Sequence, residues 1–162
     1  MKTLKPLDHT ILGVNQAVII SLLLIGFVLN SAWLVVLVAA FMLTGSLLLR
    51  KAGFFWVTRY LLRPLSLAKP DVIPDHPEPH LFAQGFGGIV LVSAAAALLS
   101  GLGSLGWALS WMVIALAALN LFGGFCVGCA IYYWLNRIRV PGFTQQPPEG
   151  ALPGFSPRSK AQ

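Results

Sequence analysis

Apolar residues form four long stretches along the chain, separated by short polar or glycine-rich segments. The stretches cover residues 11–29, 32–49, 81–99 and 107–133. A helix needs about 20 apolar residues to cross a bilayer, and lipid offers no water to unpaired backbone groups, so each stretch is expected to be a helix. Only Asn30 and Ser31 separate the first two stretches, and a glycine-rich turn separates the last two. The pattern predicts an all-α fold, a polytopic membrane four-helix bundle made of two helical hairpins.

Composition agrees with a membrane protein. The 162 residues are 57% hydrophobic and 10% charged, whereas an ordinary soluble domain is roughly 45–50% apolar and about 25% charged. Too few charges are left to cover a water-exposed surface, which excludes a soluble globular protein. The formal net charge of +6 does not indicate a nucleic-acid partner, because the basic residues lie between the apolar stretches and form no patch on a solvated fold.

The basic residues predict an orientation. All eleven lysines and arginines lie before the first stretch, between the second and third, or after the fourth. The two short hairpin connections contain none. Because positive residues are enriched in cytoplasmic loops, we expect a multi-pass protein of the inner (cytoplasmic) membrane with both termini in the cytoplasm. The lipid bilayer is then its first partner.

The segments between and after the stretches differ in character. Residues 1–140 are expected to form the four-span membrane domain, with an interfacial loop at 50–80 and a disordered tail at 141–162. Within the loop, residues 53–67 mix aromatic side chains with Arg59 and Arg63, which is typical of a segment lying in the membrane surface. Residues 69–79 contain four prolines and are expected to be extended.

The only two cysteines, Cys126 and Cys129, form a CxxC pair. This spacing serves a reversible disulfide or two ligands of a metal ion. If the fourth helix is continuous, the thiols lie in its C-terminal part, in apolar surroundings, and are inert. If Gly123 and Gly124 break it, a short new helix starts at Cys126 and its N-terminal amides favour the thiolate. A packing interpretation stays open, because Gly124 and Gly128 form a small-xxx-small pair and cysteine is itself a small buried residue.

Several other polar residues are expected near the cysteines. Asn15, Gln16 and Gln84 open the first and third stretches, in the same leaflet as the CxxC pair, whereas Asn120 is expected near the middle of the fourth. Interhelical hydrogen bonding explains each amide singly, but the set suggests a polar site. His80 follows a proline at a helix start and is a candidate proton carrier or metal ligand. His9 and His76 are expected to be solvated, and Asp75-His76 is too short a signal to predict a site.

These motifs carry a family resemblance. The motifs are Asn15-Gln16, the runs Glu78 to Gln84 and Gly124 to Cys129, and Tyr132 after them. Together they resemble a family of small bacterial membrane proteins known as domain of unknown function 4395, over about residues 8–137. The resemblance implies a bacterial inner membrane and a thioredoxin-like or sulfur-transfer protein as a candidate partner. It implies no cofactor, and none can be named. The motif positions that transfer are Asn15, Gln16, His80, Phe82, Gln84, Cys126, Gly128 and Cys129.

Three functions follow from these residues, and whether the protein is an enzyme stays open. The leading hypothesis is that Cys126 and Cys129 handle thiol, disulfide or sulfur groups, with His80 and the amides shaping the site and a cytoplasmic or quinone-like redox partner. The second is a non-catalytic scaffold or accessory subunit that packs through Gly124 and Gly128, with homo-oligomerisation open. The third is metal binding by Cys126, Cys129 and His80, with His9 or His76 as an optional further ligand, although no second ligand pair has a characteristic zinc spacing.

Overall fold

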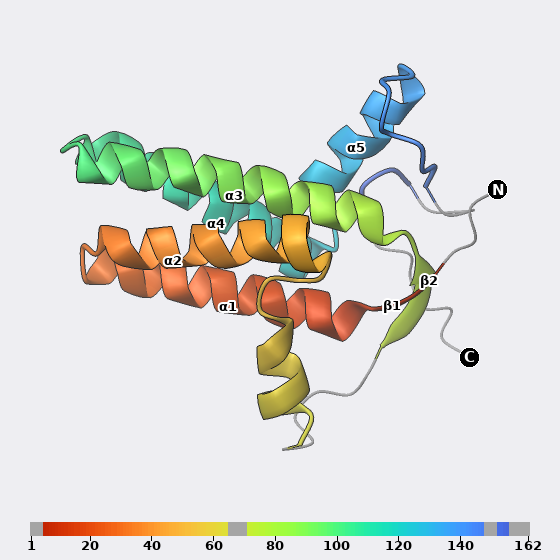
Figure 1. Ribbon diagram of the computed structural model, residues 1–162, viewed down its shortest axis with the longest axis horizontal. Coiled ribbons are helices and arrows are strands. Elements are labelled where there is room, and N and C mark those ends of the chain that lie inside the picture. Colours follow the sequence, from red (N-terminus) through yellow and green to blue (C-terminus); the bar gives the residue numbers. More distant parts are fainter. Residues whose placement is uncertain (1–4, 65–70, 148–151, 156–162) are drawn as a thin grey trace.

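Four long helices lie side by side and form the body of the protein (Figure 1). The structure is a computed structural model that describes residues 5–64, 71–147 and 152–155. The helices are α1 (His9–Val28), α2 (Ala32–Leu43) continued by the π-helical turn η1 (Thr44–Leu49), α3 (Pro77–Leu99) and α4 (Gly103–Gly123). Each of the four, with η1 counted in the second, is long and apolar enough to cross a membrane. The predicted mostly helical fold with four candidate spans is therefore confirmed.

The core is a narrow apolar seam between the helices. Its buried members come from all four: Ile19 and Leu23, Val35 and Val38, Leu91 and Ala94, and Val113 and Ile114. At most 28% of each candidate span is buried, and large apolar side chains such as Trp33, Leu47 and Phe122 are exposed on the outside. An apolar outer surface around a small core is the arrangement that a bilayer covers, which suggests a multi-pass membrane protein.

The two ends of the bundle differ. The short hairpin turns lie at one end, and the strands β1 (Lys5–Asp8) and β2 (Val72–Asp75) lie at the other (Figure 1). The strands pair antiparallel, with Lys5 opposite Asp75 and Asp8 opposite Val72. Because β1 leads directly into α1 and β2 into α3, this ladder brings the first turns of those two helices together.

The connection after α2 folds back against the bundle. It contains a second π-helical turn, η2 (Val57–Leu62). Phe54 and Phe55 are buried, whereas Trp56 and Tyr60 are exposed and stack with ring centroids 5.1 Å apart. Exposed aromatic side chains beside Arg59 fit the predicted interfacial segment; residues 65–67 of that prediction lie outside the described residues.

The fourth stretch is broken, which corrects the continuous span expected over 107–133. Helix α4 ends at Gly123, Gly124 adopts a left-handed conformation with φ 62°, and a separate helix, α5 (Val127–Arg137), starts three residues later. Two consecutive glycines favour this ending, since glycine is a poor helix former and adopts positive φ without steric cost. α5 leaves the bundle at an angle (Figure 1), so Asn120 lies in the last turn of α4 and not near the middle of a span.

The described parts of the tail contact α5, although the tail was expected to be disordered. The Phe143 ring packs against Phe82 and Tyr132, with centroids 5.3 and 5.0 Å away. The carbonyl of Gly154 accepts a hydrogen bond from the Cys126 backbone N–H, at 2.7 Å. The rest of the predicted disordered segment, 148–151 and 156–162, lies outside the described residues.

Candidate functional site

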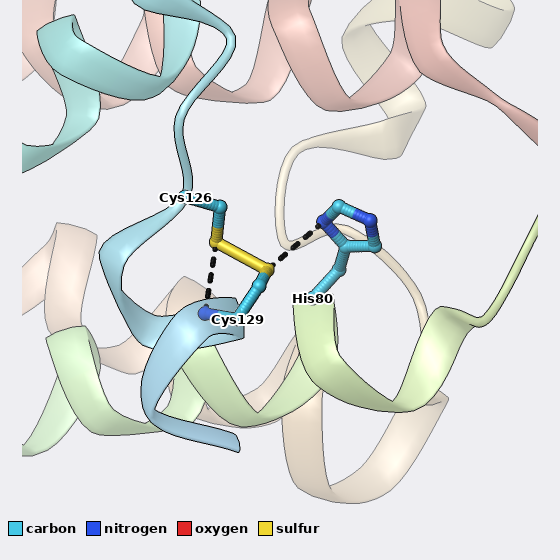
Figure 2. A group of neighbouring side chains, drawn as sticks. All are labelled: His80, Cys126 and Cys129. Atoms are coloured by element: carbon cyan, nitrogen blue, oxygen red, sulfur yellow. Dashed lines mark hydrogen bonds between the residues drawn. A yellow bond between two sulfur atoms is a disulfide. The ribbon is translucent and has the colours of Figure 1, made fainter. Parts of the chain in front are cut away.

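Cys126 and Cys129 form a disulfide at the start of α5 (Figure 2). Cys126 is the N-cap residue of that helix, and the backbone N–H of Cys129 donates to the Cys126 sulfur at 3.2 Å. Both side chains are buried, with 6% and 3% exposed. A helix N-terminus and a directed N–H group stabilise negative charge. In the reduced protein they favour the thiolate form of Cys126.

Helix α5 meets α3 through a glycine. A Cβ atom added to Gly128 would lie 2.5 Å from the Ala83 Cβ, so the backbones approach as closely as only glycine allows. The contact places the first turn of α5 beside the first turns of α3, where His80 lies. The predicted packing role therefore fits Gly128. It does not fit Gly124, around which a Cβ would meet no described heavy atom within 4 Å and whose conformation instead ends α4.

Gly128→Ala is expected to destabilise the protein by about 1–3 kcal/mol, because α5 must move away from α3 to admit the methyl group. The matched control is Gly103→Ala, since a Cβ there meets no described heavy atom within 4 Å and φ is not in the left-handed region. Thermal unfolding of both variants in detergent measures the difference. Equal midpoints would contradict the close contact.

The imidazole of His80 lies against the disulfide. Its Nδ1 atom is 3.5 Å from the Cys129 sulfur, and Figure 2 shows the ring beside the sulfur pair. On the other side of the ring, Nε2 lies 3.0 Å from Oδ2 of Asp75. A disulfide sulfur, an imidazole and a carboxylate thus follow one another within hydrogen-bonding reach. This order lets a carboxylate orient an imidazole that exchanges a proton with sulfur.

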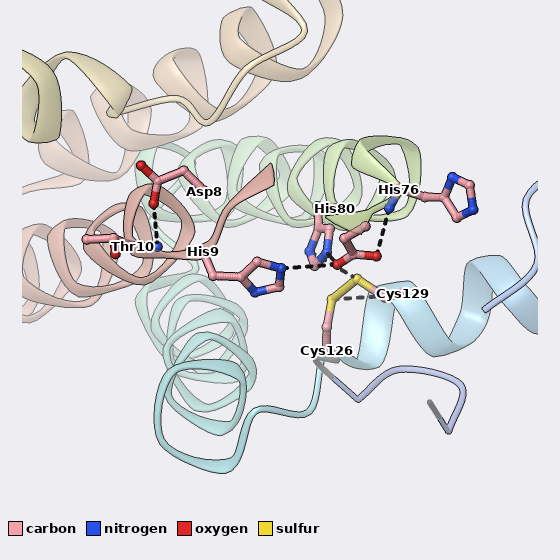
Figure 3. Close-up of polar contacts among 8 residues, drawn as sticks. Asp8, His9, Thr10, His76, His80, Cys126 and Cys129 are labelled. Carbon is pink, nitrogen blue, oxygen red and sulfur yellow. Dashed lines mark hydrogen bonds and ion pairs between the residues drawn. A yellow bond between two sulfur atoms is a disulfide. The ribbon is translucent and has the colours of Figure 1, made fainter. Parts of the chain in front are cut away.

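Asp75 is the centre of a buried polar cluster, and Figure 3 labels the three histidines around it, His9, His76 and His80. It is the last residue of β2 and only 2% exposed. His9 Nε2 lies 3.3 Å from Oδ2, and the His76 backbone N–H donates to Oδ1 at 2.7 Å. Burial alone would raise the pKa of Asp75, but its interactions with His80, His9 and the His76 N–H outweigh burial and hold that pKa below its usual range. Asp75 is therefore a carboxylate at physiological pH.

The histidine environments differ from those expected. The His9 side chain is only 12% exposed and its ring meets that of His80 edge to face, with centroids 6.0 Å apart. His76 is buried as well, although its ring points away from the cysteines in Figure 3. Neither is solvated as predicted, because the β1–β2 ladder and the start of α3 enclose them.

Two of the predicted amides hold the bundle to the loop after α2. The Asn15 side chain accepts from the Phe54 N–H at 2.9 Å and donates to Gln84 Oε1 at 3.4 Å. Gln84 also accepts from the Gly53 N–H at 3.2 Å and donates to the Met42 carbonyl at 2.9 Å. These bonds satisfy buried backbone groups, which is a positioning role.

The other two amides face open space. Two adjoining cavities, of about 110 and 170 Å³, are both lined by Gln16 and Asn120, together with Leu12 and His80. Cys126 lines the first of them. Among the described residues, neither the Gln16 nor the Asn120 side chain has a hydrogen-bond partner. The structure thus brings Cys126, His80 and two available amides around one space.

The reduced site has donors for a metal ion. One ligand atom each from His80, Cys126 and Cys129 lies within 4.8 Å of the others. Thiolate and imidazole donors suit zinc, which takes four ligands in structural sites and three plus an open position in catalytic ones. The predicted ligand trio is therefore close in space.

Sequence reasoning missed Asp75 and His9. They become neighbours of His80 only through the pairing of β1 with β2, two four-residue strands far apart in sequence. The sequence does show that His9 lies just before the first apolar stretch and Asp75 shortly before the third, which places both at the same end of the bundle as His80. That signal places residues at one end but does not place them in contact.

Comparisons with known proteins identify a family. Neither the curated proteins nor the solved structures include a match to this chain. A family model described as domain of unknown function (DUF4395) matches residues 7–137. That range includes both cysteines, His80, Asp75, His9 and the four amides. The chain belongs to the DUF4395 family.

Proposed function

We propose that this protein is a membrane thiol–disulfide oxidoreductase in which Cys126 is the reacting cysteine and Cys129 the resolving one. One observation supports this most directly: Cys126 caps α5 and receives the Cys129 N–H, whereas the Cys129 sulfur lies 3.5 Å from His80. Each cysteine thus has the neighbour that its step requires, because the attacking sulfur needs a stabilised thiolate and the resolving sulfur needs a proton carrier.

The exchange reaction can be written through these groups. A substrate thiolate attacks the Cys126 sulfur, the Cys126–Cys129 bond breaks, and Cys129 leaves as a thiolate that takes a proton from His80. A second substrate thiol then gives its proton back to His80, and its sulfur displaces Cys126 from the mixed disulfide. The substrate dithiol, which gives one proton to solvent before the attack, becomes a disulfide, and the protein disulfide becomes the Cys126 thiolate and the Cys129 thiol, so that two electrons move to the protein. Asp75 orients the His80 ring and stabilises its protonated form.

We further propose that the site end of the bundle faces the cytoplasm of a bacterial cell. The described basic residues lie at this end, on β1, on the segment after α2 and around the end of α5: Lys5, Arg50, Lys51, Arg59, Arg63, Arg137 and Arg139. The turns at the other end contain no lysine or arginine. The positive-inside rule assigns the basic end to the cytoplasm.

The decisive experiment is a redox titration of the purified protein in detergent against glutathione or dithiothreitol buffers, read by maleimide mass shift. We expect reversible two-electron behaviour with a midpoint between about −300 and −120 mV, the range of catalytic pairs. A pair that stays oxidised below that range would be structural and would contradict the proposal. Stoichiometric zinc on reduced cysteines would instead support the metal-binding alternative.

The same cysteines report the orientation. After reduction, a membrane-impermeant maleimide is expected to label them in inside-out vesicles and not in right-side-out vesicles. The opposite labelling would overturn the cytoplasmic assignment and leave the redox proposal intact.

A further inference from the structure

We infer that the cavity beside Cys126 binds the ring of a quinone, which accepts the two electrons of the cysteine pair. The inference rests on the proposed function, because it names the second substrate of the same site. A dithiol that oxidises substrates once must be reoxidised before it can do so again. The acceptor must reach Cys126, take two electrons and two protons, and enter the space that the helices leave.

The reaction balances with a quinone as the oxidant and one proton from solvent. The Cys126 thiolate and the Cys129 thiol form one S–S bond, and the S–H bond of Cys129 is lost. Two electrons pass to the ring with two protons, one from Cys129 and one from solvent, and the two quinone carbonyls become hydroxyl groups. His80 takes the proton of Cys129 and, since it also lines the cavity, delivers it to the reduced oxygen.

The size of the space fits a single ring. The two adjoining cavities measure about 110 and 170 Å³ and share Leu12, Gln16, His80 and Asn120. An apolar cavity of about 150 Å³ is large enough for benzene. The cavity that Cys126 lines is smaller than this, so a substituted six-membered ring needs both adjoining cavities, which together do not admit a folded protein.

The walls have the chemistry of a quinone site. Most of the lining of the cavity that includes Cys126 is apolar, and its polar groups are few: His80, the cysteine and side-chain amides. Gln16 and Asn120 present N–H donors without a partner among the described residues, and such donors hold the carbonyl oxygens of a quinone. A few convergent polar groups in an apolar cleft are typical of small-molecule sites.

The open side of this cavity faces the bilayer. Four of its lining residues, Phe86, Met112, Leu116 and Ile131, are exposed on the outer apolar surface of α3, α4 and α5. Leu116 lies seven residues before the end of α4, which is about 10 Å along the helix. A ring that enters here keeps its isoprenoid tail among lipid chains.

The test uses the reduced full-length protein in lipid nanodiscs with decylubiquinone or 2,3-dimethyl-1,4-naphthoquinone, whose substituted rings do not add thiols. Disulfide formation is followed by maleimide mass shift and quinol formation by absorbance. Leu116→Trp fills the entrance, and Leu119→Trp is the matched control, since Leu119 is an exposed leucine of the same helix that lines neither cavity. We expect either quinone to oxidise wild type and Leu119→Trp, and Leu116→Trp to react on the order of tenfold more slowly.

Oxidation of the same samples by oxidised glutathione separates this inference from the proposed function. All three proteins are expected to react with it alike. If glutathione oxidises the pair and neither quinone does, the quinone inference falls and the oxidoreductase proposal stands. Equal slowing of both tryptophan variants, or of neither, would overturn the cavity as the site of quinone reaction. A pair that resists every oxidant would overturn both.

Discussion

Replacing Cys129 with serine is expected to leave Cys126 trapped in a mixed disulfide, whereas Cys126→Ser is expected to leave almost no adduct. In the first variant the Cys126 thiolate attacks a disulfide and no second thiol remains to release the product. In the second, the remaining thiol is that of Cys129, which lies beside His80 and does not itself line the cavity that Cys126 lines. Either substitution abolishes turnover, the largest loss expected for any change in this chain.

The fraction of Cys126 that is thiolate limits how much faster it forms the adduct than an ordinary cysteine. An ordinary cysteine with a pKa of about 8.5 is only about 3% thiolate at pH 7, so full stabilisation of the thiolate accelerates attack by up to about thirtyfold. The measurement is intact-protein mass spectrometry after the reduced variants meet hydroxyethyl disulfide, a small uncharged probe. The double serine variant is the blank. Equal adduct formation on both single variants would show that the roles of the cysteines are not distinct.

The body of the bundle could be predicted because its signal is local and strong. Each apolar stretch is long enough to cross a bilayer, and the stretches at 11–29 and 32–49 turn at Asn30, whose φ of 47° suits an asparagine. The length and low polarity of these stretches are enough to predict helices, since lipid permits few alternatives to a helix. Tertiary contacts are not needed to make that prediction.

The end of α4 could not be decided from the apolar pattern. Residues 107–133 stay apolar on both sides of Gly123 and Gly124, so hydropathy shows no boundary there. The break depends on the left-handed backbone of Gly124 and on contacts made afterwards, among them Gly128 against Ala83 and the Gly154 carbonyl on Cys126. The chemistry of the cysteines depends on this break, because it moves Cys126 from a helix interior to a helix N-terminus.

The carboxylate of the site was hidden for a different reason. Asp75 lies in a proline-rich segment with no helical or strand periodicity, and its partner strand begins at Lys5, 70 positions earlier in the sequence. Short strands of this kind form when neighbouring helices bring them together, so their register is a tertiary property. The sequence shows His9 and His80 individually, but it does not show that both contact the carboxylate of Asp75.

His80→Ala is expected to slow disulfide exchange by about 100-fold, because general acid–base catalysis contributes at least that much where a positioned side chain moves the proton. Asp75→Asn keeps the size of the side chain but removes the charge that orients and stabilises the imidazole, so a loss of about tenfold or more is expected. His76→Ala is the matched control, since its ring points away from the sulfurs and its backbone N–H is retained. Stopped-flow kinetics with hydroxyethyl disulfide gives the rates.

The pH dependence separates proton transfer from a merely structural role. With the pKa of Asp75 held below its usual range, its contribution to stability is complete above about pH 4 and is lost only as the pH falls through the lower folded value. A structural effect of Asp75→Asn therefore appears below about pH 4, where the stability of wild type falls with the pH and the stability of the variant falls less. The proton-transfer effect of His80 appears instead in the exchange rate: both proteins slow as the pH falls and thiolate is lost, but the ratio of the wild-type rate to the His80→Ala rate changes with pH. Parallel rate profiles for the two proteins would show that His80 only supports the fold.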